Sequence, residues 1–193
     1  MSKATQETIA SYLTDMLALE EHLQKALAGQ LATLKGGSSA EVVAEIRTTS
    51  EVHAYALRDL TDSRTRGGQG MAEAVKKAAS SVLGMGAAAV DMVRGDEKLP
   101  KQLRDDYAAV CLASVGYLML HTTAVTLNDS KVADLAFAHL RDYAKASRRL
   151  FSVVPESVVE FLADEGFPVH DDIGARINDA VDEVWQSGAS SQA

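Results

Sequence analysis

Three ionisable side chains stand at positions where a helical apolar stripe would place Leu or Val. At spacings of three and four residues, one stripe includes Glu20, a second includes His53 and a later one includes His139. Apolar residues at these spacings form the buried face of a helix, so the three side chains are expected to point inward. Buried ionisable groups are costly unless they are paired, neutralised or bound to metal. The pattern therefore predicts a polar site inside a helical core.

Two further residues belong to this candidate site. His121 extends a stripe that also contains Tyr107, Val110, Ser114, Leu118 and Val125, and Asp142 lies one turn after His139 in the stripe Val132, Leu135, Ala146 and Leu150. Imidazoles and carboxylates are common ligands of Zn, Fe and Mn. The predicted metal ligands are therefore Glu20, His53, His121, His139 and Asp142. Two carboxylates and three imidazoles suit one Zn or Fe(II) ion better than a dinuclear cluster.

The same residues also allow a structural interpretation. Glu20 with His53, and His139 with Asp142 or Tyr143, would then be hydrogen-bonded pairs that fix the register of neighbouring helices. A third hypothesis is a small-molecule pocket between helices, at the gaps left by Gly84, Gly86 and Gly116. The residues alone do not decide between these interpretations, and they identify no catalytic residue.

Composition restricts the classes of partner. The 193 residues are 47% hydrophobic and 24% charged, with a net charge of −8, which is typical of one compact domain and unlike a nucleic-acid-binding surface. The first residues do not resemble a signal peptide, and no stretch approaches the roughly 20 apolar residues of a bilayer span. We therefore expect a cytoplasmic protein without a nucleic-acid or membrane partner. Cys111 is the only cysteine, so no internal disulfide is expected.

Long helices dominate the predicted secondary structure. The patterns and turn residues predict helices over about 5–34 and 40–64, a helical crossover over about 65–100, a helix from Pro100 to about 127, and a fourth helix to 154. These make two antiparallel hairpins in one all-α unit, residues 1–154, with the topology of a ferritin-like four-helix bundle. Residues 155–193 are expected to form a helical extension, opened by Pro155, with a last helix carrying Ile173, Ile177, Val181 and Trp185 on one face.

At these residues the chain resembles the ferritin-like superfamily, and most closely the bacterial YciE/YciF-type stress proteins. The resemblance covers about residues 8–150 and rests on residues 12–21, 49–53 and 113–142. It implies a site in which a Glu from each of two helices and a Glu-x-x-His from each of the other two hold a pair of iron or manganese ions. Three positions depart from that pattern. Ser50 stands three residues before His53, where the pattern has Glu, and Gly116 or Tyr117 stands where the third helix should carry a carboxylate. In the fourth helix the order is reversed, because His139 comes before the carboxylate of Asp142.

The resemblance implies two functions. The first is a structural or interaction protein of bacterial stress or maintenance physiology with a degenerate metal site. We expect this protein to form a homo-oligomer, namely a dimer. The alternative is a metal-binding protein that uses Fe, Mn or Zn at an atypical site, with oxidase or peroxide-related activity.

Overall fold

The protein is all-α over the residues that its structure describes. The computed structural model describes residues 2–66, 99–170 and 172–190. Within these ranges the chain forms helices and no strand, which confirms the predicted class; the helices are α1 (Lys3–Leu31), α2 (Ser38–Arg66), α5 (Leu99–Thr126), α6 (Ser130–Asp164) and α7 (Ile173–Ser190). The predicted helical crossover lies almost entirely outside the described residues, as do Gly84 and Gly86.

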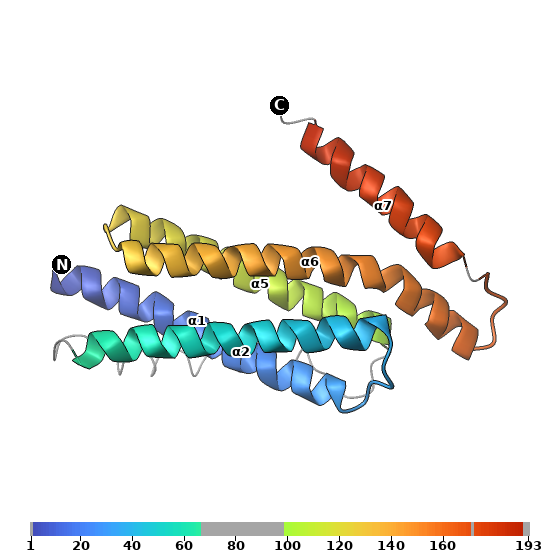
Figure 1. The fold of residues 1–193 in the computed structure, drawn as a ribbon, viewed down its shortest axis with the longest axis horizontal. Helices are drawn as coiled ribbons and strands as arrows, with labels where there is room; N and C mark the ends of the chain where they lie inside the picture. Colours follow the sequence, from blue (N-terminus) through green and yellow to red (C-terminus); the bar gives the residue numbers. More distant parts are fainter. Residues whose placement is uncertain (1, 67–98, 171, 191–193) are drawn as a thin grey trace.

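Four of the helices form two antiparallel hairpins that face each other (Figure 1). The α1–α2 connection contains Gly36 and Gly37, whose positive φ angles of 104° and 86° suit glycine. The α5–α6 turn contains Asn128 at φ 57°, and Asp129 then caps α6 by accepting a hydrogen bond from the Val132 N–H. Across the hairpins, α1 packs on α5 and α2 packs on α6. Each of the four helices therefore contacts two of the others.

The first hairpin buries the faces that its sequence pattern predicts. In α1 the buried positions include Ile9, Leu13, Met16, Glu20, Leu23 and Leu27, and in α2 they include Val43, Ile46, Ser50, His53 and Leu57. Glu21, the neighbour of Glu20, is instead half exposed and accepts a hydrogen bond from Arg58 at 2.7 Å. Glu20 is thus the carboxylate that faces the core.

In α5 the predicted face is wrong. The buried residues are Leu103, Asp106, Val110, Ala113, Tyr117, Leu120 and Ala124, whereas Leu118 and Val125 are about half exposed. The physical reason is that residues 107–126 are apolar or uncharged on every side, so no polar face sets the phase of the helix. Gly116 faces α1 so closely that an added Cβ would lie 2.5 Å from the Met16 Sδ atom. At this position the missing side chain serves close helix packing.

The second hairpin differs from its prediction in two further respects. Tyr143 is buried in α6, whereas Asp142 beside it keeps 45% of its side chain exposed. The helix also continues through Pro155 to Asp164 rather than ending at residue 154. Proline removes one backbone donor and bends a helix without having to end it, and Figure 1 shows that α6 curves in its last turns. Helix α7 packs on this part of α6, where Asn178 Nδ2 donates to the Ser152 carbonyl oxygen at 2.8 Å.

Among the described helices, α5 is long and apolar enough to cross a membrane by length and composition alone. The sequence pattern had not predicted such a stretch. A core helix of a soluble protein passes the same test, and α5 packs its buried face against α1 and α6. The helix is therefore weak support for membrane insertion.

Candidate functional site

Glu20 lies at the centre of the molecule and is completely buried. Ser50 Oγ donates to its Oε2 atom at 2.5 Å, and Tyr143 donates its hydroxyl to the same oxygen. The Oε1 atom accepts from the Tyr117 hydroxyl at 2.5 Å and from His53 Nδ1 at 3.2 Å. The four donors come from α2, α5 and α6, so this one carboxylate ties α1 to each of the other three helices of the two hairpins.

The hydrogen-bonding capacity of Glu20 is filled. A carboxylate offers about four lone-pair positions, and each of its two oxygens here accepts two hydrogen bonds. A protonated carboxyl group would need one of these positions as a donor, so the arrangement favours the ionised form. Buried charge of this kind requires such hydrogen bonds and a nearby cation.

His53 connects the buried carboxylate to the surface. Its Nδ1 atom faces Glu20, and its Nε2 atom lies 3.4 Å from Asp142 Oδ2. Because each ring nitrogen faces a carboxylate oxygen, donation from both is possible only in the imidazolium form. Glu20, His53 and Asp142 form a chain of polar contacts from the core to the surface of α6.

The two tyrosines are held as neutral hydrogen-bond donors. Burial raises the pKa of Tyr117 far above its usual value, and the negative charge of Glu20 together with the hydrogen bond to it adds to the rise. Burial and the charge of Glu20 raise the pKa of Tyr143 in the same way. Both rings meet the His53 ring edge to face, with centroids 5.6 and 4.9 Å away. The phenols therefore stay protonated and keep donating to Glu20.

His139 belongs to the same cluster through its ring face. It stacks on His53 with ring centroids 3.8 Å apart and planes inclined by 14°. Burial, followed by the positive charge of His53, lowers the pKa of His139 to about 3. Its buried Nδ1 atom has no hydrogen-bond partner. His139 is therefore a neutral ring that packs on the ring of His53.

Asp142 opens onto a small surface cleft between α2 and α6. The cleft has a volume of about 180 Å³ and is lined by Val42, Glu45, Ile46, Thr49, Asp142, Lys145, Ala146 and Arg149. Its charged side chains are already paired: Arg149 with Glu45 at 2.7 Å, and Lys145 with Asp142 at 3.8 Å. Solvent reaches the outer end of the Glu20–His53–Asp142 chain at this cleft.

The structure brings four of the five predicted site residues together and gives the fifth other partners. His121 Nδ1 donates to the Ala133 carbonyl oxygen at 2.9 Å, and its ring lies against Phe137. Of the predicted pairs, Glu20 with His53 is confirmed. The pairing of His139 with Asp142 or Tyr143 is wrong, because Asp142 contacts His53 and Tyr143 contacts Glu20. The two hairpins share one polar cluster.

The fit of the cluster to a metal ion is limited. In the described part of the chain, no three His, Cys, Asp or Glu side chains are grouped so that they could hold one. The polar atoms of Glu20 and His53 already contact each other. Glu20 also accepts hydrogen bonds from Ser50, Tyr117 and Tyr143, and His53 also contacts Asp142. An ion could bind only after some of these hydrogen bonds broke. The metal-ligand assignment stays a prediction.

The sequence pattern left two polar features undetected. It did not single out Ser50, Tyr117 and Tyr143 as donors to Glu20, although two tyrosines and a serine near the middle of separate helices were the available signal. It also missed Asp106 in α5, which is only 8% exposed and has no partner at Oδ2. Burial raises the pKa of Asp106 to about 7, Gln30 lowers it by hydrogen bonding, and Asp105 raises it by its charge.

The chain was compared with known protein families, curated proteins and solved structures. Neither protein-family models, nor curated proteins, nor solved structures give a match to the chain.

Proposed function

We propose that this chain is a ferritin-like four-helix-bundle protein of bacterial stress or maintenance physiology that acts by binding protein chains and not by catalysis. The proposed arrangement rests on the two antiparallel hairpins and on the contacts that link α1 to α5 and α2 to α6. The physiological role rests on the resemblance of residues 8–150 to the YciE/YciF-type proteins. The net charge of −8 supports a protein partner over nucleic acid or an anionic membrane, and a cytoplasmic location is part of the proposal.

The saturated carboxylate of Glu20 carries this proposal. In a carboxylate-bridged metal site, the oxygens of such a residue must be free to ligate an ion. Here two tyrosines, one serine and one histidine occupy them. Removing a donor from a buried acceptor costs about 1–3 kcal/mol, so the cluster resists opening. Its role is then to hold four helices in one register.

An interaction role also accounts for the large apolar side chains that remain exposed. Among them are Leu112 and Val115 on α5 and Val52 and Tyr55 on α2, each more than half exposed. Exposed apolar groups that cluster on a surface are typical of protein-binding faces.

Elemental analysis tests this proposal. Untagged protein is purified without chelator, incubated separately with Fe(II), Mn(II) and Zn(II), and desalted. The Glu20→Ala plus His53→Ala variant is compared with Glu21→Ala plus His22→Ala, which replaces the same two residue types at positions of α1 outside the cluster. We expect less than a tenth of an equivalent of metal in all three proteins. Near-stoichiometric metal that only the first variant loses would overturn the proposal.

One observation favours metal binding as a second candidate function. His139 Nδ1 is buried without a partner and sits directly beside His53. A neutral imidazole with a free nitrogen is a metal donor, and its affinity for metal falls where histidine protonates. A metal bound in this way would be lost in His139→Phe and retained in His121→Phe.

A further inference from the structure

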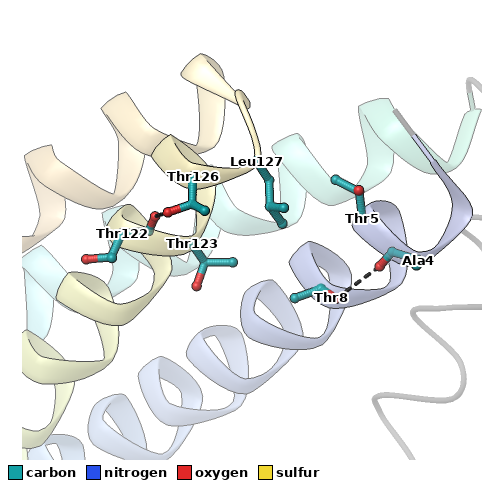
Figure 2. A pocket seen from close by; sticks show the side chains of 7 residues that line it. All are labelled: Ala4, Thr5, Thr8, Thr122, Thr123, Thr126 and Leu127. Carbon is teal, nitrogen blue, oxygen red and sulfur yellow. Dashed lines mark hydrogen bonds between the residues drawn. The ribbon is translucent and has the colours of Figure 1, made fainter.

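Two hollows on the surface of the described helices differ in what they offer a small molecule. The larger one, of about 390 Å³, lies between the start of α1 and the end of α5 and is lined by five threonines, Ala4 and Leu127 (Figure 2). It contains no charged side chain, and the hydroxyls of Thr8 and Thr126 already donate to backbone carbonyl oxygens at 3.0 and 2.8 Å. Few polar groups remain there to orient a ligand.

The cleft between α2 and α6, which we call the α2–α6 cleft, offers charges of both signs beside an apolar surface. Its apolar lining is formed by Val42, Ile46 and Ala146, each at most 9% exposed. Four charged side chains also line it, namely Glu45 on α2 and Asp142, Lys145 and Arg149 on α6. Its volume of about 180 Å³ lies below the roughly 300–1,000 Å³ of pockets that hold drug-sized molecules, so a ligand that fits it is small.

One of the two ion pairs in this cleft is open. The Lys145 Nζ atom lies 3.8 Å from Asp142 Oδ1, which is longer than a hydrogen bond, and the two side chains are 74% and 45% exposed. The other oxygen of Asp142, Oδ2, faces His53 Nε2 at 3.4 Å. A ligand can therefore enter between Lys145 and Asp142 Oδ1 while the contact to His53 stays in place.

The second ion pair is closed. Arg149 Nη1 contacts Glu45 Oε2 at 2.7 Å, which is the distance of a charge-assisted hydrogen bond. This contact joins α6 to α2 and forms one side of the cleft. Lys145 and Asp142 are thus the charged groups that a ligand can reach without separating the two helices.

We propose that the α2–α6 cleft binds a free α-amino acid with a small apolar side chain. Its ammonium donates to Asp142 Oδ1, its carboxylate accepts from Lys145 Nζ, and its side chain packs on the apolar lining. In an α-amino acid both charged groups are attached to one carbon atom, so they can take the place of the two partners of one open ion pair. The exchange is favourable because an exposed ion pair contributes little by itself.

Charge balance selects a zwitterion over a simple ion. An anion that bound Lys145 would leave Asp142 without its cation, and an amine that bound Asp142 would leave Lys145 without its carboxylate. A zwitterion compensates both. The four charges of the cleft cancel, and the net charge of −8 repels free anions, so the cleft has no general attraction for them.

A titration followed by nuclear magnetic resonance tests the site. L-valine is added to the ¹⁵N-labelled full chain, and the backbone amides of residues 42–49 and 142–149 are followed. We expect saturable shifts in these two segments, with a dissociation constant on the order of 10⁻⁴–10⁻³ M for a ligand of so few atoms. Glycine, which has no side chain to cover the apolar lining, should bind about fivefold more weakly.

Two analogues of valine test the need for both charges. Isovalerate keeps the carboxylate and the branched side chain but has no ammonium, and isobutylamine keeps the ammonium and the branched side chain but has no carboxylate. Each should bind about tenfold more weakly than valine, because each leaves one partner of the Lys145–Asp142 pair without an opposite charge.

Two substitutions test the residues. Lys145→Gln changes an exposed side chain, so the fold should survive with unchanged circular dichroism while the affinity for valine falls about tenfold. Lys131→Gln is the matched substitution on the same helix outside the cleft and should bind as the wild type does. Thr49→Phe fills the cleft without a change of charge and should also abolish the shifts.

Three results would overturn this inference: no saturable shift up to 10⁻² M valine, isovalerate that binds as tightly as valine, or an affinity that Lys145→Gln leaves unchanged. The first would leave the cleft without a ligand of this class, and the second would make it an anion site. These failures are separate from that of the proposed function, because the amino acid uses Asp142 Oδ1 and none of the atoms that surround Glu20.

Discussion

At the scale of single residues, the main feature is one buried carboxylate that is stabilised by hydrogen bonds. Glu20 is surrounded by four donors from three helices, and His53 links it to Asp142 at the surface. The inward direction of Glu20 and His53 follows from the helical period. Their partners could not be deduced in the same way, because Tyr and Ser occur on buried and exposed faces alike and only the packing of α5 and α6 selects Tyr117 and Tyr143.

Removing one of these donors should destabilise the protein. We expect Tyr143→Phe to lower the free energy of unfolding by about 1–3 kcal/mol, because a buried carboxylate oxygen loses a hydrogen bond. Urea denaturation measures the change. Tyr55→Phe removes the same hydroxyl at a position that is 72% exposed and should stay within about 0.5 kcal/mol of wild type. Equal effects of the two substitutions would contradict the role assigned to Tyr143.

Histidine burial predicts a loss of stability in acid. The pKa of His139 is about 3 in the folded protein and near 6.5 when unfolded, because burial and the charge of His53 oppose protonation. Between these values only the unfolded chain binds the proton, so the contribution of His139 falls as the pH drops from about 6.5 toward 3. The limiting slope is about 1.4 kcal/mol per pH unit. Urea titrations across this range should show the loss in the wild type and a shallower one in His139→Leu.

Asp106 should produce the opposite slope. Its pKa of about 7 lies above the unfolded value of 3.8, chiefly because of burial, so its contribution is fully present below pH 3.8 and is lost as the pH rises to 7. Relative to Asp106→Asn, the wild type should therefore become less stable over that window. A difference between the two proteins that stays constant with pH would contradict this account of Asp106.

At the scale of helices, sequence and structure agree best where a helix has a polar face. The stripes of α1 and α2 alternate clearly with charged residues, and their buried faces were predicted. In α5, residues 107–126 contain no charged side chain that would mark the exposed face of the helix. The buried face predicted for α5 was therefore wrong. The same absence of charge leaves α5 with an exposed apolar ridge. In α6 the position of Pro155 was misleading, since a long helix can bend there and continue.

The end of α2 is joined to the start of α6 by one residue that performs two tasks. Asp129 caps α6 at the Val132 N–H and accepts two hydrogen bonds from Arg64, at 2.5 and 2.7 Å. We expect Asp129→Ala to cost about 1–3 kcal/mol, and Asp129→Asn to cost less because asparagine also caps helices. Thermal unfolding compares them, with the exposed Asp134→Ala as control. If Asn and Ala had equal effects, the cap would contribute nothing.

At the scale of the whole molecule, two hairpins that were predicted separately share one polar layer. Within the first hairpin, the predicted pairing of Glu20 with His53 is confirmed. The sequence could not set the height of one hairpin against the other, since the long stretch of chain between α2 and α5 leaves that height free. The contact of His139 with His53, and of Tyr117 and Tyr143 with Glu20, therefore appeared only in the structure.

Thermal unfolding with and without metal is the most direct test of the central claim, that the Glu20 cluster is complete without an ion. A ligand that binds only the native state adds about 2.7 kcal/mol at a concentration 100 times its Kd, which raises Tm by several degrees. We predict the same Tm in chelator and in Fe(II), Mn(II) or Zn(II). A rise in Tm with one of these ions that Glu20→Gln abolishes and Glu21→Gln preserves would contradict the claim and identify a metal centre.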